Sequence, residues 1–255
     1  MADNGQSLPL RPMRTVLSDA TYSRIREKLL THDIAPGERI NIDALARDLD
    51  VSQTPVREAL ARLESEDLVT KEPLRGYTAT TLLTVPQIRD LFQFRGLIEP
   101  WAAAMAARDI NEEGIARINA ELEKGQAAEH LDIDGAYSAM SEHDARFHAL
   151  IAELSGSEFV RDAYVRTHCH LHLFRLYTVL KTWVELPRED AEVIGDLFEL
   201  YYQPKSGFLA FKEHQAISDA VTSGDESNAA RLMLQHIESS LHRFAPTMSV
   251  MEKNQ

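Results

Sequence analysis

The chain of 255 residues has little cysteine and no long apolar run. Cys169 is its single cysteine, which excludes an internal disulfide and is typical of proteins of the reducing cytoplasm. No apolar segment approaches the roughly 20 residues that a membrane-spanning helix needs. The first residues are polar, with Asp3 and Arg11, so we interpret residues 1–17 as a mobile arm and not as a signal peptide. We therefore expect a cytoplasmic protein without a membrane partner.

The chain also lacks an excess of positive charge. Its 27 Lys and Arg residues face 40 Asp and Glu residues, which gives a net charge of −13. The first 82 residues hold 11 basic and 13 acidic residues, so most of the negative charge lies in the remainder. A protein that binds nucleic acid through general basicity is thereby excluded. The length favours two domains, each large enough for its own core.

Residues 51–63 predict a helix that presents one face to a partner. Thr54 is expected to cap this helix, and Pro55 suits its first turn. Apolar residues recur at helical spacing as Val56, Ala59, Leu60 and Leu63. The opposite face carries Gln53, Thr54, Arg57 and Ala61, a polar and cationic patch suited to phosphates and base edges.

The flanking segments extend this helix into a recognisable plan. Residues 42–49 predict a preceding helix capped by Asn41, and Asp50 tolerates the left-handed backbone of a sharp turn. Two short strands are expected at residues 68–72 and 77–81, joined by a turn at 73–76. Helix, turn, helix and hairpin form the plan of a winged helix-turn-helix, although similar helical pairs occur in proteins that never bind DNA.

The residues themselves resemble a known family. Residues 36–40 (PGERI), residues 51–60 (VSQTPVREAL) and Gly76 resemble the DNA-binding domain of GntR-type bacterial transcription regulators. The domain would span residues 18–82, and its expected DNA-contacting residues are Arg39, Arg47, Gln53, Thr54, Arg57, Arg62, Arg75 and Gly76. The family usually has Arg at the position of Gln53, and some members have Arg at the position of Asp43. With so few cations, we expect weak non-specific DNA binding and a strong dependence on salt.

Everything after Thr84 is helical in pattern. We expect helices near residues 85–108, 111–130, 134–154, 157–182, 188–203, 206–223 and 225–244. A helical domain would therefore span residues 84–245, followed by a C-terminal tail at 246–255. The predicted fold is mainly α, an N-terminal winged helix-turn-helix followed by an all-helical antiparallel bundle.

Four potential metal ligands lie on inward faces of this bundle. Asp144 and His148 are one turn apart on one helix, and His214 and His236 lie on the apolar faces of two others. A metal ion would satisfy all four. Each residue alone is also compatible with an ordinary hydrogen-bonded core position. His168, His170 and His172 are a weaker candidate, because alternate residues do not share a helix face.

A second resemblance favours the metal. Asp144 with His148, Glu213-His214 and Gln235-His236 are similar to the FCD effector domain of the FadR subfamily, whose metal-binding members use one Asp and three His. The resemblance implies a divalent ion on Asp144, His148, His214 and His236. One oxygen and three nitrogens suit Zn²⁺ first, and also Ni²⁺, Mn²⁺ or Fe²⁺. Residues 183–207 make the interval to His214 long and predict an added helix.

The implied effector is a small organic acid bound beside the metal. Arg95 lies on an inward stripe, where it could clamp a carboxylate or pair with Glu99 one turn on. Glu99, Arg166 and His170 are the other expected effector contacts.

We therefore expect a regulator that is not an enzyme. Two chains would form a homodimer that reads a short inverted repeat of double-stranded DNA, under control of the effector. Two alternatives remain: a regulator whose metal site is purely structural, with the effector bound elsewhere, and a metal-dependent hydrolase with an accessory winged helix.

Overall fold

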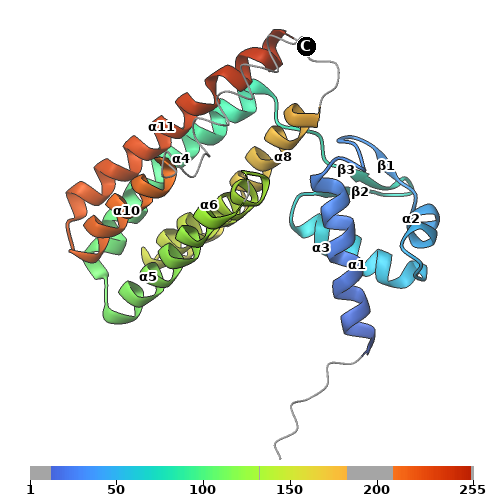
Figure 1. Cartoon of the computed structure of the whole chain (residues 1–255), viewed down its shortest axis with the longest axis horizontal. Helices are drawn as coiled ribbons and strands as arrows, with labels where there is room; N and C mark the ends of the chain where they lie inside the picture. Colours follow the sequence, from blue (N-terminus) through green and yellow to red (C-terminus); the bar gives the residue numbers. More distant parts are fainter. Residues whose placement is uncertain (1–12, 132, 183–208, 254–255) are drawn as a thin grey trace, which may run out of the picture. The chain divides into compact units, whose positions relative to one another are not determined.

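The computed structural model describes residues 13–131, 133–182 and 209–253, and the statements below concern these residues. The chain divides into two compact units, Met1–Leu82 and Leu83–Gln255, called here the N-terminal and C-terminal units (Figure 1). Among the described residues, no helix combines the length and the apolarity that crossing a bilayer requires.

The N-terminal unit is a winged helix-turn-helix, as predicted. Its elements are α1 (Met13–Leu30), β1 (Arg39–Ile40), α2 (Ile42–Asp48), α3 (Gln53–Ser65), β2 (Val69–Glu72) and β3 (Gly76–Ala79). The three strands form an antiparallel sheet in the order β1-β3-β2, with Lys71 opposite Tyr77. The sequence predicted the β2–β3 hairpin but not the third strand.

Helix α1 corrects the predicted N-terminal arm. Residues 13–17, which were assigned to a mobile arm over 1–17, form the first turns of this helix. Farther along α1, Ile25 and Leu29 are fully buried, and the helix packs against α3. Continuous hydrogen bonding from these anchored turns keeps the earlier residues helical. Residues 1–12 lie outside the described residues.

The connection between α2 and α3 follows the sequence closely. The Asn41 side chain accepts hydrogen bonds from the backbone N–H groups of Asp43 and Ala44, so the predicted cap is confirmed. Asp50 takes the predicted left-handed backbone, with φ of 53°. Helix α3 begins at Gln53 with Ser52 as its N-cap, so the predicted cap at Thr54 is wrong and Thr54 lies inside the first turn. The apolar stripe of α3 is fully buried, as expected.

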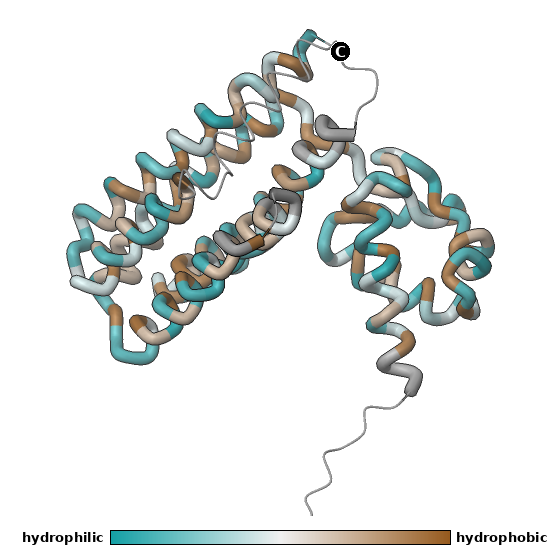
Figure 2. Tube along the Cα trace, in the orientation of Figure 1, coloured by the Kyte–Doolittle hydropathy of each residue, from teal (hydrophilic) through white to brown (hydrophobic). Residues whose placement is uncertain are grey.

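The C-terminal unit is helical throughout its described part. Its elements are α4 (Val85–Asp109), α5 (Glu112–Gln126), the 3-10 helix η1 (Ala127–His130), α6 (Ile133–Leu154), α7 (Glu158–Val165), α8 (Cys169–Thr182), α10 (Leu209–Thr222) and α11 (Glu226–Lys253). Thr84 caps α4 in a capping box with Gln87. Figure 1 shows α11 alongside α4, and α5 alongside α6. Apolar and polar residues are interspersed along these helices (Figure 2). Buried apolar residues such as Ile88, Phe147 and Met233 form the core.

Two predicted helices have different limits in the structure. The single helix expected over 157–182 is two helices, because His168 adopts a left-handed backbone with φ of 43° between them. The predicted tail at 246–255 is wrong up to Lys253, because α11 continues through Pro246. Burial of Met248, Val250 and Met251 offsets the backbone hydrogen bond that a proline removes. The helix expected at 188–203, within the added segment 183–207, lies outside the described residues.

Candidate metal centre and nucleic-acid interface

Part of the predicted DNA-contacting set surrounds one hollow on the N-terminal unit. All eight predicted residues are exposed. A hollow of about 610 Å³ lies between β1, α2, α3 and the β2–β3 turn, and its lining includes Arg39, Arg57, Arg75 and Gly76. Gly76 has φ of 88°, which other residues rarely adopt, so it allows the tight turn at the tip of the hairpin. The hollow is therefore bordered by three cations that reach solvent.

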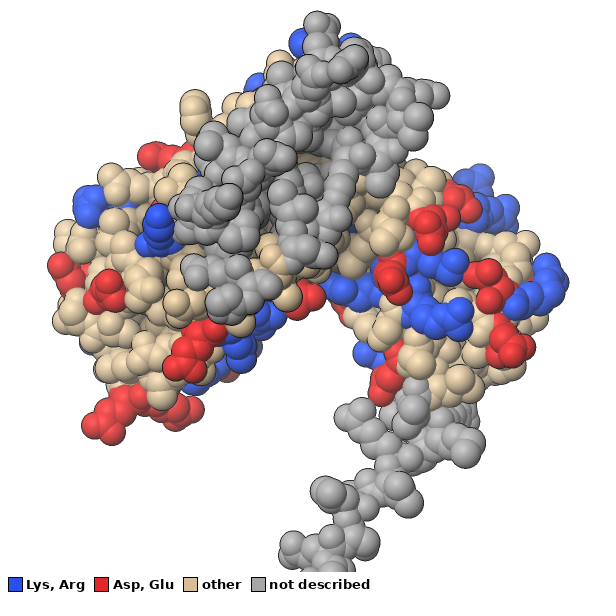
Figure 3. Space-filling model, viewed as in Figure 1, with Lys and Arg blue, Asp and Glu red and all other residues tan. Residues whose placement is uncertain are grey.

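The other predicted DNA contacts lie elsewhere on the same unit. Arg47, Gln53 and Thr54 are exposed on α2 and α3 but do not line the hollow. Arg62 lies against α1, where its Nη1 donates to Asp19 Oδ1 at 2.8 Å and its guanidinium covers the ring of Tyr22 at 3.9 Å. On the face of this unit that Figure 3 shows, Lys and Arg side chains are interspersed with Asp and Glu. Positive charge on this unit is therefore confined to small groups of side chains, which agrees with the near balance of basic and acidic residues over residues 1–82.

The two departures from the family pattern touch one another. Gln53 Nε2 donates a hydrogen bond to Asp43 Oδ1, and Arg57 Nη2 donates to Gln53 Oε1 at 3.4 Å. The amide of Gln53 is therefore held between a carboxylate of α2 and a guanidinium of α3. This network orients two of the side chains that the sequence predicts at the DNA surface.

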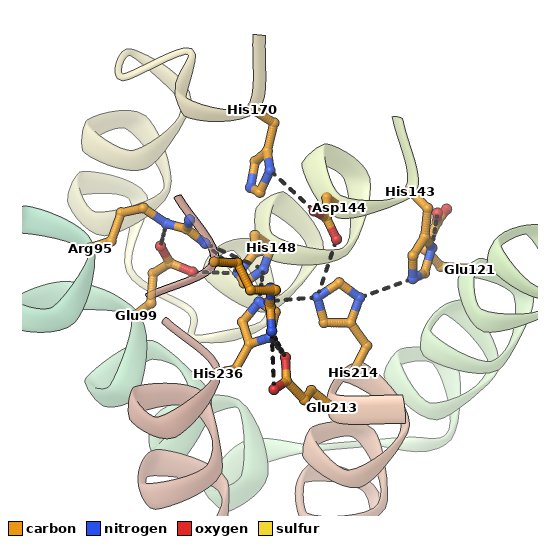
Figure 4. A network of polar contacts seen from close by, with 11 residues as sticks. Arg95, Glu99, Glu121, His143, Asp144, His148, His170, Glu213, His214 and His236 are labelled. Atoms are coloured by element: carbon orange, nitrogen blue, oxygen red, sulfur yellow. Dashed lines mark hydrogen bonds and ion pairs between the residues drawn. The ribbon is translucent and has the colours of Figure 1, made fainter. Parts of the chain in front are cut away.

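Three histidines from three helices meet in the interior of the C-terminal unit. His148 of α6, His214 of α10 and His236 of α11 are all buried, and their potential ligand atoms lie within 4.8 Å of one another (Figure 4). His236 Nε2 lies 3.1 Å from His148 Nε2 and 3.3 Å from His214 Nε2. Asp144 Oδ1 lies 3.4 Å from His214 Nε2. The structure thus brings together the four residues that the sequence predicts as ligands.

The opposite nitrogen of each histidine has a partner outside this cluster. His148 Nδ1 hydrogen-bonds to Glu99 Oε2, and His236 Nδ1 to Glu213 Oε2 at 2.8 Å. His214 Nδ1 contacts His143 Nε2 at 3.1 Å. A carboxylate only accepts, so the N–H groups of His148 and His236 point outward and their Nε2 lone pairs point inward.

This donor set fits a divalent cation. Nitrogens held about 2.0–2.1 Å from a tetrahedral zinc ion lie about 3.3 Å apart, close to the Nε2 separations found here. Asp144 Oδ1 is buried without a hydrogen-bond partner. Burial lowers the pKa of His148 to about 4 and holds the pKa of His214 well below its ordinary value, so both stay neutral. Neutral imidazoles and a free carboxylate oxygen are what a metal requires.

Comparison with known proteins identifies both units. Residues 17–78 match the family model described as "Bacterial regulatory proteins, gntR family", and residues 90–239 match the FCD domain. The chain belongs to the GntR family and carries an FCD domain. It is 34% identical over 211 residues to the Nta operon transcriptional regulator of Aminobacter aminovorans, covering 82% of this chain and 85% of that one.

Other relatives of this GntR-family chain are also regulators. The HTH-type transcriptional regulator LutR of Bacillus subtilis is 26% identical over 220 residues, which cover 80% of this chain and 90% of LutR. The solved structure of E. coli McbR/YncC aligns with a TM-score of 0.59 and 18% identity, over 94% of this chain and 99% of that one. The last likeness shows a shared fold.

In the FCD domain, Arg95 and Glu99 form a buried ion pair beside the histidines. Arg95 Nε donates to Glu99 Oε1 at 2.6 Å, and both side chains are at most 2% exposed. Burial opposes ionisation of Glu99, but Arg95 and His148 outweigh it and lower the pKa of Glu99 to about 2. The pairing that the sequence left open for Arg95 is therefore present. Arg95 Nη2 also lies 3.4 Å from His148 Nε2.

The other predicted effector contacts separate into two groups. His170 is buried, stacks on His148 with ring centroids 5.1 Å apart, and places Nδ1 3.7 Å from Asp144 Oδ2. Arg166 is exposed at the end of α7, where it is the C-cap residue, and its predicted contact with the effector stays a prediction. Two buried atoms near the cluster have no hydrogen-bond partner: His170 Nε2 and Tyr164 Oη.

Sequence reasoning missed several partners of the cluster. His143 hydrogen-bonds to Glu121 Oε1 through Nδ1 at 3.0 Å, and Glu213 holds His236. The helical spacing of Met140, His143 and Phe147 is a signal that could have indicated an inward His143, but the sequence analysis assigned Asp144 to that face. Cys169, also in this region, is buried, and burial raises the pKa of its thiol to about 11.

Proposed function

We propose that this GntR-family regulator binds its operator under control of a small organic acid held next to a divalent metal in the FCD domain. The observation that carries the proposal is the meeting of three buried Nε2 atoms, two of them facing lone pair to lone pair, beside the unpartnered Asp144 Oδ1. Lone pairs facing each other in a dry interior repel unless a cation lies between them. Asp144, His148, His214 and His236 are the proposed ligands.

The metal is proposed to be Zn²⁺ first, with Ni²⁺, Mn²⁺ and Fe²⁺ as the other ions that this donor set accepts. Four protein ligands leave a position free when the ion takes five or six. A carboxylate of the effector would take that position. The bound ion supplies an electrophilic centre for the carboxylate, and the protein supplies the selectivity.

Two unpartnered groups support an acidic effector. Tyr164 Oη can donate a hydrogen bond, and so can His170 Nε2 in the tautomer that carries its proton there; both atoms are buried without a partner. Both rings lie next to His148, with centroids 6.3 Å and 5.1 Å away. Buried polar groups without partners destabilise a protein, so an oxygen-rich ligand at this place would be stabilising. Arg95 adds positive charge behind the His148 ring.

The output of this site is proposed to be the placement of two DNA-reading units. Two chains would associate as a homodimer, and the two α3 helices would enter the major groove at the halves of a short inverted repeat in the bacterial cytoplasm. An effector that binds one arrangement of the helical domain more tightly shifts the population toward it. The DNA affinity then changes with effector concentration.

The test is a double substitution that removes two ligands. In the full chain, His148→Ala with His214→Ala is expected to lower the metal content from about one ion per chain to background, measured by mass spectrometry of the metal. A thermal-shift panel of mono- and dicarboxylic acids then compares wild type with and without chelator. Unchanged metal content in the double variant would reject the site.

The two alternatives give different results in the same panel. A purely structural metal predicts that acids shift the melting temperature equally with and without chelator. A metal-dependent hydrolase would need a general base, and Glu99, the inward candidate, is paired with Arg95 and has a pKa of about 2. A base works best with a pKa near the operating pH. We propose that the protein is not an enzyme, and turnover of an ester panel with added metal would contradict this.

A further inference from the structure

We infer that His143 and Glu121 form a positioning pair that sets the tautomer of His214, so that His214 offers a lone pair to the metal. The absence of a side chain at Gly125 leaves room for the His143 ring in this pair. This inference rests on the proposed metal site and goes beyond its ligands. His143, Glu121 and Gly125 belong to none of the sets predicted from the sequence.

The pair extends from the metal ligand to the next helix. His214 Nδ1 lies 3.1 Å from His143 Nε2, and His143 Nδ1 lies 3.0 Å from Glu121 Oε1 (Figure 4). His143 is fully buried on α6, and Glu121 is 5% exposed on α5. A line of hydrogen bonds therefore runs from α10 through α6 to α5.

The direction of these hydrogen bonds follows from chemistry. A carboxylate oxygen such as Glu121 Oε1, which already accepts from Arg146 Nε, pairs with an N–H group, so Nδ1 of His143 carries the proton and its Nε2 carries a lone pair. That lone pair accepts the Nδ1–H of His214, which leaves the lone pair of His214 on Nε2, facing the cluster. If His143 had the other tautomer, His214 would present an N–H to the metal position and could not coordinate.

His214 differs in this respect from the other two ligands. His148 and His236 each contact a carboxylate directly, Glu99 and Glu213. For His214 the carboxylate acts through an intervening imidazole. Glu121 is itself fixed, because Arg146 Nε donates to it at 2.9 Å. The tautomer of His214 is therefore set by His143 and Glu121, which are not themselves proposed metal ligands.

Gly125 gives independent support for the pair. A Cβ at this position would lie 2.7–2.8 Å from the Nδ1, Cε1 and Cγ atoms of His143, closer than real Cβ atoms approach. Gly125 lies one turn after Glu121, in the last turn of α5, and is buried. The absence of a side chain lets the His143 ring reach Glu121.

The test compares two substitutions at one position in the full chain. His143→Leu removes the acceptor, whereas His143→Gln keeps an acceptor oxygen near the place of Nε2. Zn²⁺ affinity is measured by competition with a chromophoric chelator. We expect His143→Leu to bind Zn²⁺ about 10–100-fold more weakly than wild type, and His143→Gln to recover most of the loss.

A second pair of variants covers the case in which His143→Leu fails to fold. Gly125→Ala is expected to weaken Zn²⁺ binding by displacing the ring, while the matched helical control Gly96→Ala is expected to leave it unchanged, since its Cβ meets only Leu234 at an ordinary 3.8 Å. Thermal unfolding of the metal-free variants reports any purely structural effect. The ligand-field spectrum of bound Co²⁺ reports coordination by His214.

The possible outcomes separate the inference from the function on which it rests. Wild type without measurable Zn²⁺ affinity would overturn the metal site and the positioning pair together. Wild type that binds Zn²⁺, with His143→Leu and Gly125→Ala binding equally well and giving the same Co²⁺ spectrum, would overturn the positioning pair alone. Weaker binding in both variants with recovery in His143→Gln supports it.

Discussion

The two units of the protein place their functional side chains in opposite ways. In the N-terminal unit the arginines around the hollow are exposed, and they lie between residues 39 and 75. In the C-terminal unit the three candidate histidine ligands are buried, and they are separated by up to 88 residues along the chain. Water solvates an exposed cation, whereas a buried charged group is stabilised only by partners within the fold. The comparison predicts where substitutions act on stability and where they act on binding.

The largest expected difference concerns a buried and an exposed arginine. Arg95→Met leaves the Glu99 carboxylate buried without its guanidinium, and we expect a loss of about 3–5 kcal/mol in the stability of the C-terminal unit. The exposed pair of Arg75 and Glu72 makes Arg75→Met the control, with a change below about 1 kcal/mol. Urea unfolding of the metal-free proteins measures both. Equal losses would contradict the contrast between the units.

Within the N-terminal unit, two arginines of α3 should differ in DNA binding. Arg57 lines the hollow, so Arg57→Ala is expected to weaken operator binding by about 1–3 kcal/mol while the helical unit stays folded. Arg62 is already engaged by Asp19 and Tyr22, so Arg62→Ala should cost less. Fluorescence anisotropy on an operator selected from random DNA gives both affinities. A larger loss for Arg62→Ala would reverse the assignment.

A smaller effect should follow from restoring the residue usual in the family. Gln53→Arg adds a cation to the exposed start of α3, next to Asp43. Each added phosphate contact steepens the slope of log affinity against log salt by about 0.9. We expect a change of this size between Gln53→Arg and wild type, and little change for Gln53→Ala. A slope unaltered by Gln53→Arg would mean that this position does not face the phosphates.

The smallest effect is a dependence on alkaline pH in the N-terminal unit. Burial, together with the hydrogen bond from Tyr22 to Glu66 at 2.6 Å, raises the pKa of Tyr22 to about 12. Because this pKa is above the unfolded value of 10, the contribution to stability is complete below pH 10 and is lost as the pH rises toward 12. Melting curves of wild type and Tyr22→Phe should converge over this range. Curves that stay parallel would contradict the assignment.

The fold could largely be predicted from local patterns. The cap at Asn41, the turn at Asp50 and the apolar stripe of α3 depend on neighbours in the sequence, and all three are confirmed. The break at His168 carries no proline or glycine signal, so the sequence predicted a continuous helix there. At Pro246 the error was the opposite: the sequence predicted a tail after residue 245, but α11 continues. Tertiary packing of the residues after Pro246 prevails over the local preference of proline to end a helix.

The convergence of the four candidate ligands could be predicted from the sequence, but their hydrogen-bond partners could not. Helical spacing predicted that Asp144, His148, His214 and His236 face the interior of the bundle, and the structure brings them together. The partners Glu121 and Glu213 are charged residues that look like ordinary solvated positions in the sequence. Their role depends on which helices pack against each other, which spacing within one helix does not determine.

The buried thiol has a practical consequence for labelling the chain at a chosen site. Cys169 is 2% exposed and its pKa is near 11, so at neutral pH its sulfur reacts slowly with maleimides and spin labels. It is the single cysteine of the chain. A cysteine engineered at exposed Leu74 on the hairpin tip would then be the preferred labelling position. In the proposed homodimer, double electron–electron resonance between the two labels would report the spacing of the hairpins before and after an acid is added.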